Sequence, residues 1–254
     1  MNALWVCLLL LFISLILPFT VGPILVRFKS SHPASPEFEP AGVGQLPPEV
    51  ADNFNSFVYA MSADGFQFVG YFRQLAYMRG VGFFLALLKN PMTSDMAYMI
   101  DIFANNGLTP MRAAQVEFCT DFSDGTEIST NNGQQPSMHK VHSEMKVFRF
   151  PEAHNLRLLY QLHSRLCASL VAPEVKRVAL TDGMEVFRLA YGTVKEVRKQ
   201  ADFGYYYLDE KKDVFRPTLK GAYLMTWKLA WPVGALRQAR MKSKARATMK
   251  SLGF

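Results

Sequence analysis

Residues 139–144 bring together three side chains that could bind a metal ion. His139, His142 and Glu144 lie within the segment HKVHSE, and imidazole nitrogens and carboxylates are both zinc ligands. A zinc site needs several ligands at fixed geometry, and this polar segment has no cysteine or aspartate cluster nearby to complete the set. We therefore predict that these residues form a solvated loop and that the chain holds no metal site.

Motifs for nucleophilic catalysis and for nucleotide binding are missing from the sequence. It contains no G-x-S-x-G elbow, no Walker loop and no G-x-G-x-x-G after a predicted strand. His163 falls on an apolar helical stripe, where we expect a hydrogen-bonded core histidine and not a ligand or a base. Asp121, Asp124 and Glu127 surround a predicted hairpin turn, where carboxylates are solvated by default. The sequence thus favours a protein without enzymatic activity, predicts no cofactor and identifies no catalytic residue.

The elements that would position these residues run from a helix to strands and back to helices. A helix opens at Pro48 and Glu49, with apolar residues at spacings of three and four through residue 61. Two helices at residues 155–171 and 182–201 and a small hairpin at residues 205–215 follow the strands. Apolar runs of strand length lie at residues 66–72, 80–88, 96–104, 115–122, 126–130 and 147–150. This order predicts an α+β fold, with an antiparallel β-meander flanked by helices.

The strand at residues 115–122 has the clearest pattern. Every second residue from Val116 to Phe122 is apolar or threonine, and an alternation of period two places one face on a core and the other in water. Asp124-Gly125 predicts a tight turn directly after it. The residues expected to face water are Gln115, Glu117, Cys119 and Asp121.

The chain has no charged side chain before Arg27. A bilayer core about 30 Å thick needs roughly 20 apolar residues in a helix, and residues 3–26 are uncharged and rich in leucine. The segment lacks the basic start and the A-x-A site of a secretory signal, so we predict an uncleaved transmembrane helix over residues 1–29 in a single-pass membrane protein. Arg27 and Lys29 follow it, and the positive-inside tendency then places the N-terminus outside and the main domain in the cytoplasm.

Composition and charge divide the rest of the chain. Residues 30–48 are rich in proline, serine and glycine and predict a linker, and residues 49–217 are expected to form the globular domain. Residues 1–217 contain 20 basic and 21 acidic side chains, whereas residues 218–254 contain eight basic ones and no acid, so the last segment accounts for the whole net charge of +7. We expect an apolar-then-polybasic helix there, which is typical of an interaction element.

The C-terminal segment allows three interpretations. In the first, Trp227 and Trp231 share one helical face at the headgroup level, and the basic run binds an anionic membrane surface. In the second, the apolar residues pack into the domain core and the basic helix is solvated. In the third and least favoured, a winged-helix-like order binds nucleic acid. The basic residues are Arg237, Arg240, Lys242, Lys244, Arg246 and Lys250.

These observations predict a membrane-anchored, non-enzymatic binding or scaffold module that works at the membrane surface. Its expected partners are the lipid bilayer, an anionic surface in particular, and an unknown protein, whereas nucleic acid is not expected. The alternative is a membrane-tethered enzyme acting on a lipid or envelope precursor, with a pocket between the sheet and the helices. A concave pocket with convergent polar side chains of shifted pKa would favour the enzyme.

Overall fold

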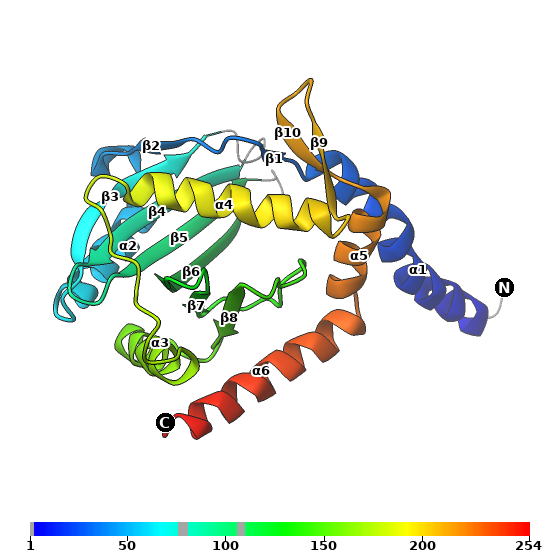
Figure 1. Cartoon of the computed structure of the whole chain (residues 1–254). Helices are drawn as coiled ribbons and strands as arrows, with labels where there is room; N and C mark the ends of the chain where they lie inside the picture. The colour runs from blue at the N-terminus through cyan, green and yellow to red at the C-terminus, as the bar shows by residue number, and fades with distance from the viewer. Residues whose placement is uncertain (1–2, 76–80, 106–109) are drawn as a thin grey trace. The chain divides into compact units, whose positions relative to one another are not determined.

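The computed structural model describes residues 3–75, 81–105 and 110–254 and confirms the α+β class. In these residues the chain forms six α-helices, one short 3-10 helix and two β-sheets (Figure 1). The helices are α1 (Ala3–Lys29), η1 (Val43–Gln45), α2 (Pro48–Ser62), α3 (Leu156–Leu170), α4 (Glu185–Asp202), α5 (Leu219–Leu229) and α6 (Val233–Ser251). The strands are β1 (His32–Pro33), β2 (Phe38–Pro40), β3 (Gln67–Gln74), β4 (Val81–Asn90), β5 (Asp95–Asn105), β6 (Pro110–Asp121), β7 (Glu127–Asn131), β8 (Met145–Arg149), β9 (Tyr206–Asp209) and β10 (Val214–Pro217).

The chain folds into two compact units, each made of stretches that are separated in the sequence. Unit 1 comprises residues 1–35, 136–140 and 194–240. Unit 2 comprises residues 36–135, 141–193 and 241–254. Residues 30–48, predicted as a linker, contain β1 and β2 and pass from unit 1 to unit 2 after residue 35.

Unit 2 is built on a sheet whose described strands have the order β2-β3-β4-β5-β6-β7-β8. From β2 to β7 the neighbours follow one another along the chain and pair antiparallel, as the predicted meander requires. β8 pairs parallel with β7, because residues 132–144 first return the chain to the other end of the sheet. Gly80, the first residue of one predicted strand, lies outside the described residues.

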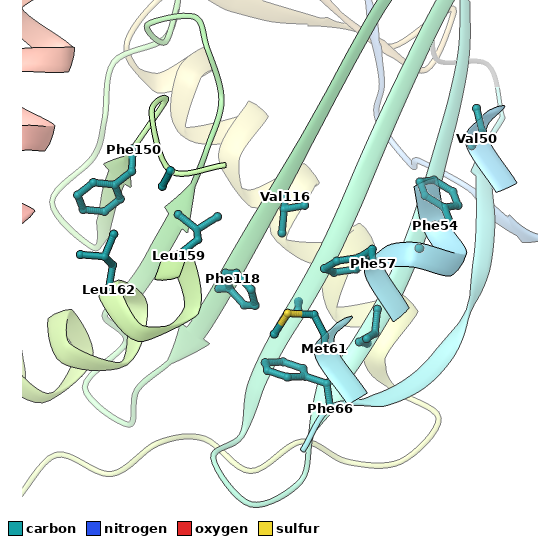
Figure 2. Close-up of a cluster of buried hydrophobic side chains, with 14 of the residues drawn as sticks. Val50, Phe54, Phe57, Met61, Phe66, Val116, Phe118, Phe150, Leu159 and Leu162 are labelled. Carbon is teal, nitrogen blue, oxygen red and sulfur yellow. The ribbon is translucent and has the colours of Figure 1, made fainter. Parts of the chain in front are cut away.

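One face of this sheet packs against α2 and α3 and forms the main core of unit 2. The buried residues of α2 recur at spacings of three and four, which places them on the side of the helix that faces the sheet. Burying one large apolar side chain contributes about 1.5–3 kcal/mol. Figure 2 shows the side chains that meet there, among them Phe54, Phe57 and Met61 of α2, Phe118 of β6, and Leu159 and Leu162 of α3.

The opposite face of the sheet is covered as well, which corrects the prediction that it faces water. Val186 and Leu189, in the first half of α4, pack against an apolar cluster formed by β3, β4 and β5. On β6, the carboxylate of Glu117 accepts a hydrogen bond from the hydroxyl of Ser129 on the neighbouring strand. The alternation therefore located the second part of β6 correctly, but on its second face Glu117 binds Ser129 of β7 and Asp121 binds Arg188 of α4.

Unit 1 contains the antiparallel sheet β1-β10-β9, and α1 lies alongside α5 (Figure 1). The predicted hairpin over residues 205–215 is confirmed as β9 and β10. The core of the unit is formed by Val197, Tyr205, Tyr206, Phe215 and Met225, with Val26 of α1 packed against it.

The transmembrane helix predicted over residues 1–29 is not found. None of the described helices combines the length and the apolar character that a bilayer span requires. The prediction used hydrophobicity and length alone, and these cannot show that part of α1 packs against the protein itself.

Candidate membrane-binding surface

Close contact between α1 and α5 brings two apolar helices together. The rings of Phe19 and Trp227 lie 5.2 Å apart, centroid to centroid. A Cβ atom on Gly22 would lie 2.6 Å from Cγ2 of Thr226, so the absence of a side chain at Gly22 allows this approach. The contact occupies one side of α1, where Pro23 is buried.

Outside this contact α1 presents large apolar side chains to solvent. Their positions recur in pairs every four residues, slightly more than one turn, so they form a stripe that winds slowly around the helix. Their exposed fractions lie between 39 and 76% in α1. The stripe consists of Phe12, Ile13, Ile16, Leu17, Val21, Ile24, Leu25 and Phe28. Contiguous apolar surface of this kind marks a site of interaction with a membrane or with another protein.

α5 extends this surface with outward aromatic residues. Its N-cap is Thr218, whose hydroxyl accepts a hydrogen bond from the amide of Gly221 at 2.8 Å. Ala222 and Met225 face the core, while Tyr223 and Trp227 point outward and are 48 and 52% exposed. We call the exposed apolar side chains of the stripe on α1, with Tyr223 and Trp227, the α1–α5 surface.

Trp231 does not share a helical face with Trp227, which corrects the prediction of one continuous helix. α5 ends at Leu229, and Trp231 lies in the connection to α6, because Pro232 cannot continue the hydrogen-bonded helix. The indole of Trp231 is nevertheless 65% exposed.

The predicted basic residues are not gathered on one free tail. In unit 1, Arg237 donates hydrogen bonds to the carbonyl oxygens of Ser137 at 2.8 Å and Lys228 at 3.1 Å. In unit 2, Arg246 makes two hydrogen bonds of 2.8 and 2.6 Å to the carboxylate of Glu152. Arg240, Lys244 and Lys250 are exposed and Lys242 is half-buried.

The second half of α6 belongs to the core of unit 2. Ala245 is buried there, and Met249 and Leu252 pack against the same cluster. Residues 241–254 therefore pack on unit 2 through their apolar side chains, whereas the second interpretation of the C-terminal segment expected a solvated basic helix.

The surplus positive charge lies entirely in the unit that carries the α1–α5 surface. The segments of unit 1 contain 13 basic and 5 acidic side chains, a net charge of +8. The segments of unit 2 contain 15 basic and 16 acidic side chains, a net charge of −1. An anionic bilayer surface attracts a unit that combines exposed apolar side chains with a net positive charge.

The prediction for His163 is confirmed, since this buried residue lies inside a hydrogen-bonded network of unit 2. Thr120 donates its hydroxyl proton to Asp95, and its oxygen lies 2.9 Å from Nε2 of His163. Nδ1 of the same ring lies 3.0 Å from the hydroxyl oxygen of Thr130. Both ring nitrogens thus meet an oxygen that can accept, which suits a doubly protonated imidazole.

Electrostatics agree with this protonation state. Burial would lower the pKa of His163, but the hydrogen bonds and charges of Asp95 and Cys167 outweigh it and raise the pKa. Burial would raise the pKa of Asp95, but His163 and the neighbouring hydroxyl groups lower it. Asp95 also accepts hydrogen bonds from Arg177 and from Tyr160. The arrangement is a buried ion cluster that joins α3 to strands β5, β6 and β7.

A second polar cluster lies on the other face of the sheet. The phenol of Tyr98 is 3.2 Å from the thiol sulfur of Cys119, and this thiol is 3.8 Å from the carboxylate of Glu117. Burial raises the pKa of Tyr98 and of Cys119 well above their ordinary values, and the charge of Glu117 adds to it. The thiol therefore stays protonated, whereas a cysteine nucleophile must ionise.

The histidines of residues 139–144 are not in a solvated loop, so that prediction was wrong. His142 is buried in unit 2, and His139 is half-buried in unit 1, where its Nε2 lies 2.9 Å from the hydroxyl of Tyr206. No signal in the sequence links residues 139 and 206. Throughout residues 3–75, 81–105 and 110–254, no three side chains of His, Cys, Asp or Glu are grouped so as to hold a metal ion.

Comparison of the chain with protein-family models, with curated proteins and with solved structures finds no match.

Proposed function

We propose that this chain is a non-enzymatic module that unit 1 attaches to a lipid bilayer, so that unit 2 is presented to a protein partner. The observation that supports this most strongly is the α1–α5 surface, because large apolar side chains are exposed on the same unit that carries a net charge of +8. Insertion of apolar side chains and attraction of cations to anionic headgroups act in the same direction.

In this function α1 lies at the bilayer interface and does not cross the membrane. Trp227 and Tyr223 on α5 suit this depth, because aromatic rings with a polar edge favour the headgroup level. Arg27 and Lys29 at the end of α1 favour the side of the bilayer with anionic lipids, which supports a cytoplasmic position for unit 2. Cleavage of unit 2 by a protease added to inverted but not to right-side-out vesicles would test the orientation.

Vesicle flotation of the full chain tests the attachment. We expect the variant Phe12→Gln, Leu17→Gln, Ile24→Gln to lose binding, because these three exposed side chains each contribute about 1.5–3 kcal/mol when they enter an apolar phase. The partition coefficient should fall by more than about a hundredfold. The matched control replaces Tyr59 and Met92 of unit 2, which are 84 and 90% exposed, and should bind as the parent does.

Two further experiments test the contribution of charge and the alternative of nucleic-acid binding. Replacing the exposed Lys29, Lys220 and Arg240 of unit 1 with glutamine should weaken binding to vesicles with phosphatidylserine and leave binding to neutral vesicles unchanged. A duplex DNA competitor should not displace the chain from vesicles. Retention of binding by the apolar triple variant would reject the α1–α5 surface as the membrane contact.

A further inference from the structure

Helix α4 has an apolar side that is exposed to solvent. Val186 and Leu189, in its first half, pack against strands β3, β4 and β5, over which this part of the helix lies (Figure 1). Met184, Phe187 and Tyr191 follow at spacings of three and four, which places them together on the other side of the helix. They are 46, 63 and 61% exposed, and the rings of Phe187 and Tyr191 stack with centroids 6.4 Å apart. We call Met184, Phe187 and Tyr191 the α4 stripe.

The charges around the α4 stripe favour a protein over a lipid surface. Between residues 184 and 194 the only charged side chains are Glu185, which is buried, and Arg188, which binds Asp121 of β6. The stripe therefore offers no exposed cation to anionic headgroups, and unit 2 has a net charge of −1. Exposed apolar and aromatic side chains without such cations are typical of a protein-binding surface.

Gly192, directly after Tyr191, is a helical glycine that the packing of the chain does not require. The described helices contain three other glycines, and a Cβ atom on each would press against the chain itself: Gly22 against Thr226, Gly221 against Tyr205 and Gly234 against Leu229. A Cβ atom on Gly192 would meet nothing within 4 Å. Glycine within a helix is destabilising relative to alanine, and its usual benefit is the close approach of another backbone. We therefore expect a second helix to approach α4 at Gly192.

The two ends of the α4 stripe carry opposite charges. Asp182 precedes the helix, and its side chain is 92% exposed. Three of the four charged residues from 195 to 199 are basic, and among them Arg198 is exposed and follows Tyr191 by two helical turns, so it lies on the side of the stripe. A second α4 laid antiparallel on the stripe brings Asp182 of each copy near Arg198 of the other, whereas a parallel one brings like charges together. The exposed Asp202 ends the helix one turn further on, beyond the length over which the copies overlap.

We propose that the α4 stripe is a self-association surface, on which α4 of a second copy of this chain packs antiparallel about a two-fold axis near Ala190. A two-fold axis uses the same surface twice, so each copy supplies Phe187 and Tyr191 to one aromatic centre. A single pair of helices buries less than the about 1,600 Å² of a standard interface, so the dimer is weak in solution. Attachment of both copies to one bilayer raises their local concentration, a consequence that rests on the function proposed above, although the pairing itself does not.

Sedimentation velocity of the full chain in neutral detergent measures the pairing. We expect a dimer that dissociates on dilution, and we expect Phe187→Ser/Tyr191→Ser to sediment as a monomer. The matched control Tyr59→Ser/Met92→Ser removes two side chains of unit 2 that are 84 and 90% exposed, and it should dimerise as the parent does. A parent chain that is monomeric at about 1 mM, or a dimer that persists in Phe187→Ser/Tyr191→Ser, would overturn the proposal.

A second background excludes association through α1. The variant Phe12→Gln, Leu17→Gln, Ile24→Gln weakens the α1–α5 surface and is measured without detergent. We expect it to dimerise with a dissociation constant within about threefold of that of the parent, because distant sites contribute independently. A dimer that forms only in the parent chain with detergent would assign the association to α1 or to a shared micelle and would overturn the role of α4.

Charge reversal tests the antiparallel arrangement and the identity of the partner. Asp182→Arg and Arg198→Glu should each weaken the dimer by about tenfold or more, because either variant places like charges at both ends of the pair. An equimolar mixture of the two variants should dimerise as the parent does, since opposite charges then meet at both ends. Recovery in the mixture also shows that both variants are folded. A mixture as weak as the single variants would reject a second copy as the partner.

Gly192→Ala separates pairing from folding. Alanine is the better helix former and has room in the single chain, so the midpoint of urea unfolding at low protein concentration should rise. The dimer should become weaker, because the added Cβ atom enters the space expected for the second helix. A dimer as strong as that of the parent would contradict the close approach and overturn the packing proposed.

Vesicle flotation distinguishes this proposal from the membrane attachment. Phe187→Ser/Tyr191→Ser should bind vesicles as the parent does. Loss of binding in this variant would assign the α4 stripe to lipid and overturn the self-association. Failure of the parent chain to bind vesicles, with dimerisation intact, would reject the membrane attachment and leave the pairing standing.

Discussion

Replacement of Asp95 with asparagine should destabilise unit 2 strongly while leaving its shape unchanged. Asp95 is completely buried and accepts hydrogen bonds from Thr120, Tyr160 and Arg177. Its Oδ1 atom also lies 3.8 Å from Nε2 of His163, which is equally buried. Asparagine has nearly the same size but no charge, so the imidazolium loses its counterion inside the core.

The expected loss of stability comes from the charge of His163, which stays buried without its partner. Removing one partner of a buried ion pair costs about 3–5 kcal/mol, because the other charge stays desolvated. The matched control is Arg73→Gln, which breaks the exposed pair of Arg73 and Glu39, where the side chains are 49 and 43% exposed. Exposed pairs contribute at most about 1 kcal/mol, so the control should change stability little.

The same cluster predicts how the stability of unit 2 depends on pH. The pKa of His163 is raised, so its contribution is complete below pH 6.5 and is lost as the pH rises through the raised value. The pKa of Asp95 is lowered, so its contribution is complete above pH 3.8 and is lost as the pH falls through the lowered value. Both contributions are complete between pH 3.8 and 6.5, and the loss above 6.5 should become smaller in Asp95→Asn.

Amide exchange in β5, β6 and α3 of the full chain measures these free energies locally, and urea unfolding at several pH values measures them globally. The slowest amides of these elements report the opening of unit 2. A loss in Asp95→Asn no larger than that in Arg73→Gln would refute the assignment of a charged cluster, as would a stability of the parent chain that rises steadily above pH 6.5.

The remaining predictions concern the start of α4 and the packing of α5. Lys89 binds the buried carboxylate of Glu185 at 2.6 Å and the exposed one of Asp182 at 2.5 Å, so Glu185→Gln should cost about 1.5–3 kcal/mol by denaturant unfolding while Asp182→Asn leaves the midpoint unchanged; equal effects would contradict the role of burial. A Cβ atom on Gly221 would lie directly against a backbone carbonyl of unit 1, whereas one on Gly44 meets no atom within 4 Å. Gly221→Ala should therefore lower the melting temperature of unit 1, measured by circular dichroism, and Gly44→Ala should not; a stable Gly221→Ala variant would show that the helix can move away.

The strands could be predicted because their signal is local. Residues 115–122 alternate with a period of two, and the observed strand β6 ends at Asp121, one residue before the predicted end. Tight-turn residues at 124 and 125 located the hairpin to β7 for the same reason. The parallel pairing of β8 escaped prediction, because a loop of polar residues does not show to which end of the sheet it returns.

Only part of the candidate site could be predicted from the sequence. The apolar character of α1 follows from composition, but the contact of α1 with α5 joins residues about 200 positions apart. His139 seemed solvated because its neighbours in sequence are polar, yet its environment is set by Tyr206 and His32. Interactions between distant segments depend on the topology, and no local pattern encodes them.

The long separation between α1 and α5 has a consequence for synthesis on the ribosome. Thr226 is translated about 200 residues after Gly22, and at about 5–20 residues per second this takes about 10–40 s. During that interval the nascent α1 segment has no helical partner of its own chain. Its exposed apolar side chains are then open to a chaperone or a bilayer until α5 emerges.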